Sequence, residues 1–274
     1  MAGLGQETKW KRDWKVNLEI SIALLVDYIG QFLWPFVRIS AFAMVMPVIG
    51  GSFVPAQVRL LVALTLTMVV APILPEKTSV DFLSLAGLIL IIQEMLIGVA
   101  IGFSVQLVFD AIALGGQIIA MSMGLGFAVF LDRTRGVNIP VLGQLFLMLG
   151  MLIFLSLDGH LALIQLVADS FRILPASVGG LSQVAIMNLI QWTGQVFIVA
   201  LKIALPAITA LIVVNLSFGV TSRAAPTLNL FAVGFPVAML LGFVVIFLNM
   251  ESLTENVSRL LDDALTMLPA LLRS

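Results

Sequence analysis

Residues 82–131 read FLSLAGLILIIQEMLIGVAIGFSVQLVFDAIALGGQIIAMSMGLGFAVFL, and this stretch decides the class of fold. The apolar run contains two carboxylates, Glu94 and Asp110, and the glycine pair Gly115-Gly116. A helix needs about 20 apolar residues to cross a bilayer, so the run is too long for one crossing. Paired glycines favour a break and allow close backbone approach. We therefore predict either two helices that meet at the glycine pair or one long segment that bends back there.

The composition of the whole chain indicates a membrane protein. Of its 274 residues, 61% are hydrophobic and 11% are charged, whereas a soluble domain is roughly 45–50% apolar. A net charge of -1 argues against a nucleic-acid partner, because binding phosphates requires a basic face. The absence of cysteine excludes disulfides, thiolate nucleophiles and cysteine-based metal sites. We expect lipid and apolar protein surfaces as partners, and no cofactor or metal.

Other apolar segments lie on both sides of this stretch. Those long enough to cross a membrane are 18–49, 58–74, 139–157, 184–218 and 228–249. The segment 161–174 is shorter and more mixed, and we expect it to be re-entrant or interfacial. The residues 175–182 form the clearest loop. The fold prediction is an all-α, polytopic membrane-type protein whose long helical hairpins are broken by glycine and proline.

The two ends of the chain differ from its apolar centre. In the tail, 250–274, apolar residues recur at helical spacing, at Leu253, Val257, Leu260, Leu261, Leu265 and Leu268. This spacing is typical of an amphipathic helix that lies on a surface or a partner. The expected organisation is a polar N-terminal extension at 1–17, a helical domain at 18–250 and an amphipathic C-terminal helix at 251–274. Too few loops carry Lys or Arg to fix an orientation in the membrane.

Ionisable side chains inside the apolar segments are the first candidates for function, because an unpaired charge within a membrane is costly. They are Asp27, Arg38, Arg59, Glu94, Asp110 and Lys202. One interpretation is a polar conduit or an ion relay. The other is a set of helix-end residues and charge pairs that fix how helices assemble. The sequence leaves both open.

The single histidine, His160, follows Asp158 by two residues. A carboxylate could orient this imidazole in an intramembrane enzyme. However, Asp-Gly-His is also simply a turn followed by a helix start. Because no second ligand or nucleophile motif accompanies it, we favour the turn and predict that the protein is not an enzyme.

Two methionines lie between the glycine pair and two further glycines. The residues concerned are Gly115, Gly116, Met121, Met123, Gly124 and Gly126. A flexible backbone with soft methionine side chains would suit a deformable closure across a passage. Small residues equally suit close packing of helices in membranes, and composition alone favours this second interpretation.

A polar break separates the last two long apolar segments at 221–229, and it contains Arg223 and Asn229. Arg223 could bind a lipid phosphate or a partner carboxylate, or it could cap the preceding helix as a cation near its C-terminus. Physical arguments alone do not separate these roles.

Several short motifs resemble those of a known family. They are Pro47-Val48-Ile49-Gly50-Gly51, Glu94-Met95-Leu96-Ile97-Gly98, Gly115-Gly116-Gln117-Ile118-Ile119, Met123-Gly124-Leu125-Gly126-Phe127, Asp158-Gly159-His160 and Ser222-Arg223-Ala224-Ala225-Pro226. Their order and spacing resemble the FliR/SctT family of type III export-gate subunits, and its flagellar branch in particular. One departure is Asp132, which is followed by Arg133 where family members often have proline.

The resemblance implies a single-copy subunit of a helical export gate in the bacterial inner membrane, at the flagellar basal body. Its partners would be FliP, FliQ, FlhB and unfolded export substrates. Under this resemblance the loop Gly115–Gly126 would project into the channel as a plug, with Phe127 adding apolar closure. Polar contacts between helices or subunits would come from Arg59, Glu94, Asp110 and Lys202, and contacts to a partner or lipid from Arg223 and Asn229.

Two alternatives remain at this point. One is an SctT-like subunit of a virulence injectisome, which would keep the mechanism and change the machine. The other is an ion-coupled secondary transporter in which Asp27, Glu94, Asp110 and Lys202 form an ion or substrate site.

Overall fold

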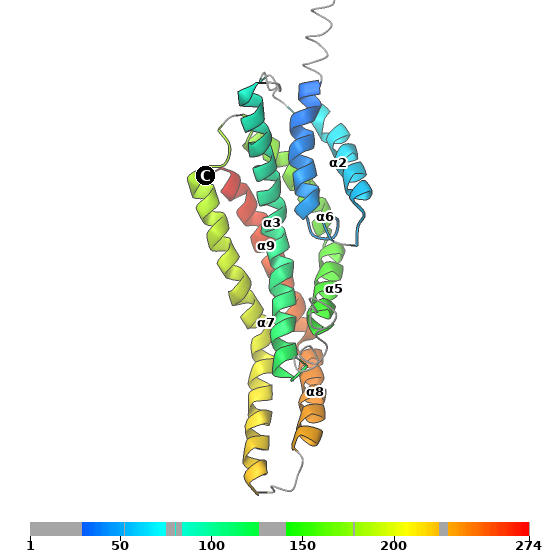
Figure 1. Ribbon diagram of the computed structural model, residues 1–274, viewed down its shortest axis with the longest axis vertical. Coiled ribbons are helices and arrows are strands. Elements are labelled where there is room, and N and C mark those ends of the chain that lie inside the picture. Colours follow the sequence, from blue (N-terminus) through cyan, green and yellow to red (C-terminus); the bar gives the residue numbers. More distant parts are fainter. Residues whose placement is uncertain are drawn as a thin grey trace, which may run out of the picture. The chain divides into compact units, whose positions relative to one another are not determined.

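A computed structural model describes residues 29–51, 53–74, 80, 84–125, 141–177, 179–224 and 230–273. Every regular element within these ranges is helical (Figure 1). The elements are a helix over Ile29–Val45, α2 (Ala56–Val70) with the short 3-10 turn η1 (Ala71–Ile73), α3 (Leu85–Ser122), α5 (Val141–Ser156), α6 (Gly159–Ile173), α7 (Gln183–Ala224), α8 (Leu230–Leu248) and α9 (Met250–Arg273). The N-terminal extension and the predicted site residues Asp27, Gly126, Phe127 and Asn229 lie outside the described residues.

Three of the described helices are long and apolar enough to cross a membrane, namely Ala56–Ile73, α3 and α7. Two further spans are possible if each bent pair of helices counts as one. The first pair is α5 and α6, which meet at an angle of 69°, and the second is α8 and α9, at 59°. The all-α, polytopic fold class is therefore confirmed, and α6, expected to be re-entrant or interfacial, is the second arm of a sharply bent pair.

The predicted break at Gly115-Gly116 is wrong. α3 continues without interruption through both glycines to Ser122. A glycine inside a helix costs about 1 kcal/mol relative to alanine, and tertiary packing routinely outweighs a cost of this size. Here the bare backbone at the two glycines is covered by neighbouring helices, as described below, so the pair serves packing rather than bending.

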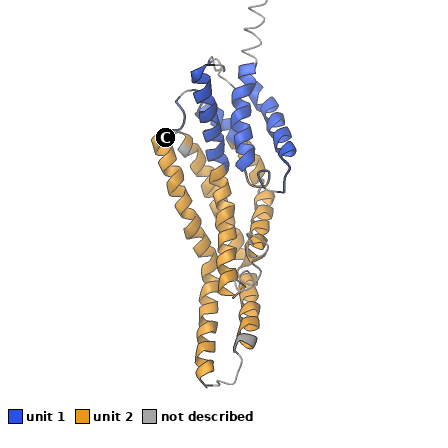
Figure 2. Ribbon diagram, in the orientation of Figure 1, with its two compact units in different colours: residues 1–45, 49–102, 167–182 blue, residues 46–48, 103–166, 183–274 orange. Residues whose placement is uncertain are grey.

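The chain divides into two compact units (Figure 2). Unit 1 comprises 1–45, 49–102 and 167–182, and unit 2 comprises 46–48, 103–166 and 183–274. The core of unit 1 is made by large side chains of the helix Ile29–Val45 and of α3, among them Trp34, Phe42, Leu90 and Ile97. Unlike these, α2 buries only Ala63, Thr67 and Val70 and turns most of its large apolar side chains outward.

Unit 2 is built on α7, which packs against both α8 and α9. The buried rings of Phe109 and Phe154 meet edge to face with centroids 5.4 Å apart. α9 buries one apolar face, including Leu253, Val257 and Leu268, and this confirms the amphipathic prediction. That face contacts α5 and α7 of the same chain, so the expectation that it rests on a separate surface or partner is corrected.

Candidate functional site

The most buried polar group of unit 1 is an ion pair between Arg38 and Glu94. Nε of Arg38 donates to Oε2 of Glu94 at 2.7 Å, and Nη2 donates to Oε1 at 2.9 Å. Both residues are 0% exposed. This is the bidentate arrangement that guanidinium and carboxylate groups favour, and it joins the helix Ile29–Val45 to α3.

Two further hydrogen bonds hold the guanidinium of Arg38. Nη1 donates to the hydroxyl of Ser170 at 3.1 Å, and Nη2 also donates to the carbonyl oxygen of Leu174 at 2.9 Å. The guanidinium carbon lies 4.1 Å from the centroid of the Phe171 ring, within the range of a cation–π contact. Arg38 therefore connects three segments of unit 1: its own helix, α3 and the C-terminal end of α6.

Close approach of two helices makes this geometry possible. A Cβ atom at Gly98, one turn after Glu94 on α3, would overlap the carbonyl oxygen of Arg38 and would lie 3.0 Å from the Cβ of Ala41. Only a glycine fits at such a crossing. Gly98 thus sets the helix separation at which the guanidinium of Arg38 reaches the carboxylate of Glu94.

Sequence reasoning identified Glu94 as a polar contact but did not assign Arg38 as its partner. The structure places the partner within the same unit, although 56 residues separate the two in sequence. Opposite charges in two apolar segments were the available signal, because a buried charge requires a counter-charge. The hydroxyl of Ser170, which is also fully buried, was not anticipated in this role.

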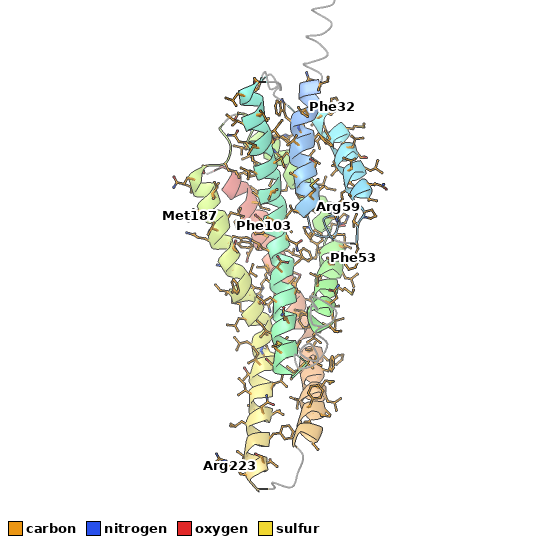
Figure 3. All side chains as sticks on the ribbon, in the orientation of Figure 1. Phe32, Phe53, Arg59, Phe103, Met187 and Arg223 are labelled. Carbon is orange, nitrogen blue, oxygen red and sulfur yellow. The ribbon has the colours of Figure 1, made fainter. Side chains whose placement is uncertain are left out.

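Arg59, another predicted polar contact, is used locally. Its Nη2 donates to the carbonyl oxygen of Gly51 at 2.7 Å and so fixes the loop that precedes α2 (Figure 3). Phe53 in this loop is 81% exposed. Arg59 therefore supports an apolar loop that projects from the surface of unit 1.

Asp110 and Lys202, both in unit 2, are exposed. Oδ1 of Asp110 accepts a hydrogen bond of 3.0 Å from Nε2 of Gln106, one turn earlier on α3. Neither residue takes part in an ion pair with another described residue. Glu94 is paired with Arg38 in unit 1, so its carboxylate is already bound to a counter-charge.

The glycine pair of α3 lies at a junction with two other helices of unit 2. A Cβ at Gly115 would lie 3.0 Å from Cγ2 of Ile203 and 3.2 Å from the carbonyl oxygen of Ala200, both on α7. At Gly116 it would lie 2.9 Å from the carbonyl oxygen of Leu142 on α5. The packing interpretation of these two glycines therefore holds, and a loop that starts at Gly115 is excluded.

The end of α3 is set by Gly124. This residue has a positive φ of 82°, and its N–H donates to the carbonyl oxygen of Met121 while that of Leu125 donates to Ala120. These two bonds define the Schellman motif, in which glycine terminates a helix in the left-handed conformation. Any loop in this region therefore begins only after Ser122.

The two methionines at this helix end differ. Met123 is 1% exposed, and its side chain occupies the space above Gly242 of α8, where an added Cβ would lie 2.6 Å from its Cγ. Met121, in contrast, is 54% exposed. Of these two methionines Met121 presents an exposed side chain, whereas Met123 anchors the end of α3 to α8.

Asp158 and His160 do not form a catalytic pair. Asp158 has a positive φ of 54° in the turn between α5 and α6 and is exposed. Nδ1 of His160 is buried and has no hydrogen-bond partner among the described residues, so the Asp158 carboxylate does not bind this nitrogen. Within the described ranges no three His, Asp or Glu side chains lie close enough together to hold a metal ion. Asp158-Gly159-His160 forms a turn followed by the start of α6, as one of the two interpretations predicted.

A comparison with protein families places these features in a known group. Residues 29–264 match the model of the bacterial export proteins, family 1, and this range includes every element from the first described helix to most of α9. The chain belongs to family 1 of the bacterial export proteins. Within this family the Arg38–Glu94 pair, the glycine junction of α3 and the α7–α8 packing all fall inside the matched range.

Individual relatives are similar to the chain over almost their full length. The chain is 41% identical over 251 residues to the flagellar biosynthetic protein FliR of Pectobacterium carotovorum subsp. carotovorum. The aligned residues cover 89% of this chain and 96% of the relative. The chain is 35% identical to FliR of Escherichia coli (strain K12), over 92% and 99% of the two chains. FliR of Aquifex aeolicus (strain VF5) is 30% identical, over 86% and 92%.

Proposed function

We propose that the chain is a non-catalytic subunit of the flagellar protein export apparatus in the bacterial inner membrane. The observation that carries this proposal is the similarity, at 41% and 35% identity, to two FliR proteins over nearly their whole length. The all-helical fold with several helices long enough to cross a membrane agrees with such a place. The relatives compared above are flagellar, which favours the flagellum over a virulence injectisome.

Complementation tests this proposal. The chain is expressed in a flagellated bacterium from which its own FliR has been deleted, and swimming and the secretion of hook and filament proteins are measured. Recovery of both is expected. Recovery of neither, while the chain accumulates in the inner membrane, would contradict the proposal. A control with the resident FliR on the same vector shows that the assay reports function.

As a finer step, the chain acts as a single-copy member of a gate formed with FliP and FliQ, and contacts FlhB. Support comes from apolar side chains that the chain itself leaves uncovered. On α2, Leu60, Leu61 and Met68 are each more than half exposed. An apolar helix face this open requires lipid or other subunits to cover it. Co-purification with tagged FliP and FliQ, followed by mass measurement of the intact complex, reports the composition and copy number.

The exposed end of α3 contributes to closing the gate. Met121 supplies an adaptable apolar side chain without directional bonds, and Gly124 releases the chain from the helix directly afterwards. This segment replaces the longer loop from Gly115, because the glycine pair is held within the helix. A closed gate of this kind would block ions and water and still yield to an unfolded chain.

Replacing Met121 with alanine tests the closure. The assembled complex carrying Met121→Ala is expected to conduct small ions more readily than the wild type after reconstitution into vesicles. Met187→Ala on α7 is the matched control, since Met187 is 51% exposed and Met121 54%. Equal leakage from the two variants would remove Met121 from the gate.

A further inference from the structure

The C-terminal half of α7 and the whole of α8 form an apolar hairpin within unit 2 (Figure 1). Among residues 203–250 the only charged side chain is Arg223. Lys202 precedes this stretch, and along a straight helix it lies about 32 Å from Arg223 at 1.5 Å per residue. The hydrocarbon core of a bilayer is roughly 30 Å thick. The two cations therefore bracket a charge-free segment whose length matches one bilayer.

The outer surface of this hairpin is suited to hydrocarbon. Leu216 on α7 and Leu240 and Phe247 on α8 are 69%, 67% and 77% exposed. The four hydroxyl groups of its described residues are satisfied internally, because Thr209, Ser217, Thr221 and Ser222 each donate to a carbonyl oxygen of their own helix. Internal satisfaction is what a lipid environment demands of polar groups. The exposed amide of Asn215 is the exception and marks one strip of α7 that needs a polar neighbour.

A small cavity, about 30 Å³, lies at the Lys202 end of the hairpin. Its polar lining consists of Lys202, Asn249, Ser252 and Asn256, and apolar side chains such as Pro206 and Val245 form the rest. Lys202 and Ser252 are exposed, so the polar side of the cavity faces outward. A cation beside amides and a hydroxyl, above an apolar wall, offers complementary contacts to an anionic headgroup with an attached acyl chain.

Charge changes abruptly at this level of the molecule. α8 carries no charge, whereas α9, which begins after a 59° bend at Asn249, exposes Glu255, Arg259 and Asp262. Glu251 lies in the first turn of α9 but does not line the cavity. Such a charged face is unsuited to hydrocarbon, so α9 does not continue the apolar outer surface of α8 beyond the bend.

We propose that Lys202, Asn249, Ser252 and Asn256 form a binding site for the phosphate headgroup of an anionic phospholipid, at the level where the α7–α8 hairpin enters the bilayer. Arg223 lies near the far end of α7 (Figure 3), about one bilayer thickness from Lys202 along the helix. A phospholipid explains the length of the hairpin, its uncharged outer face and both terminal cations together. A carboxylate of a partner subunit would explain Lys202 alone. The site does not depend on the export role, because its test measures lipid binding.

Lipid binding to the purified full-length chain, together with the subunits that co-purify with it, tests the headgroup site. Native mass spectrometry compares added phosphatidylglycerol with phosphatidylcholine. The wild type is expected to retain phosphatidylglycerol preferentially, and Lys202→Gln to weaken that retention about fivefold, the change that roughly 1 kcal/mol per basic residue at an anionic membrane surface corresponds to. Lys202→Arg should retain the preference.

Arg259→Gln is the matched control, because it removes an exposed cation of unit 2 that pairs with Glu255 on α9. It should bind phosphatidylglycerol as the wild type does. Equal retention of the two lipids by the wild type, or unchanged retention of phosphatidylglycerol by Lys202→Gln, would overturn the site. Because Lys202 is exposed, its replacement leaves the fold intact, which the elution volume of the complex verifies.

A second measurement tests the depth of the hairpin. The chain has no native cysteine, so single cysteines at Leu240 and at Glu255 can be labelled with a fluorophore without background. In bilayers of phosphatidylcholine and phosphatidylglycerol with brominated acyl chains, the label at 240 is expected to be strongly quenched and that at 255 only weakly. An unquenched label at 240 that cross-links to another subunit would show that protein covers the hairpin and would overturn the proposal.

Discussion

The guanidinium of Arg38 and the carboxylate of Glu94 are joined by two hydrogen bonds, of 2.7 and 2.9 Å, at a site where both residues are 0% exposed. Taking two charges out of water costs several kcal/mol for each ion, and their mutual attraction offsets this only when the geometry is good and the remaining donors are satisfied. The geometry is bidentate, and Ser170 and the carbonyl of Leu174 accept two further hydrogen bonds from Arg38.

Replacing only one residue of this pair should lower the free energy of unfolding far more than replacing both. Arg38→Met leaves the Glu94 carboxylate buried without a counter-charge, and a loss of about 3–5 kcal/mol in the free energy of unfolding is expected. The double variant Arg38→Met with Glu94→Leu replaces both charges with apolar groups of similar size and should regain most of this loss. Thermal unfolding in detergent, combined as a double-mutant cycle, measures the coupling. A double variant whose loss equals the sum of the losses of Arg38→Met and Glu94→Leu would show that the pair is not coupled.

Gly98 should tolerate no side chain. A Cβ there overlaps the carbonyl oxygen of Arg38, so Gly98→Ala forces the helix Ile29–Val45 and α3 apart and stretches the Arg38–Glu94 pair. Overpacking of this kind typically costs about 1–3 kcal/mol. The matched control is Gly194→Ala on α7, where nothing lies within 4 Å of the added Cβ. That variant should be neutral or slightly stabilising, and a similar loss at both positions would contradict the role given to Gly98.

Gly124 should be required for the way α3 ends. Its φ of 82° is left-handed, a conformation that costs a residue with a side chain about 1–2 kcal/mol. Gly124→Ala is therefore expected to lower the melting temperature and to loosen the contact of Met123 with α8. Gly219→Ala, at a helical glycine with open space around it, serves as the control. If Gly124→Ala melts at the same temperature as Gly219→Ala, the Schellman motif does not hold the end of α3.

Periodic features could be predicted from the sequence because they depend on near neighbours. The apolar run of α5 was expected at 139–157 and is a helix at Val141–Ser156, and the spacing of Leu253, Val257 and Leu268 gave the buried face of α9. The run at 184–218 likewise anticipated α7. In each case local hydrophobicity and length suffice to define the element.

Features that depend on distant residues could not be predicted in this way. Whether Gly115-Gly116 bends α3 depends on Ile203 and Leu142, which cover the glycines in the fold but lie far away in sequence. Local helix propensity indicates only that glycine weakens a helix. In the same way, nothing local pairs Glu94 with Arg38 rather than with another cation, and the indole N–H of Trp192 finds the carbonyl of Ser104 across 88 residues. The candidate site was therefore predicted by residue type, and its partners came from the structure.

The turn between α5 and α6 allows the structural and chemical interpretations of Asp158-Gly159-His160 to be separated. A Cβ at Gly159 would overlap the ring of Phe154, which is fully buried and packs edge to face on Phe109. Gly159→Ala must displace this ring, so a loss of about 1–3 kcal/mol is expected.

His160→Gln changes only the residue that catalysis would need. Because Nδ1 of His160 has no hydrogen-bond partner in the part of the chain that the structure describes, and because Asp158 is exposed, this variant should accumulate normally and support full swimming and secretion. The two variants are compared in a strain lacking its own FliR, with protein levels in the membrane measured alongside motility. Normal levels with lost secretion in His160→Gln would indicate chemistry at the imidazole. Normal levels of Gly159→Ala would contradict the packing role given to Gly159. They would show that the ring of Phe154 can move aside for the added methyl group.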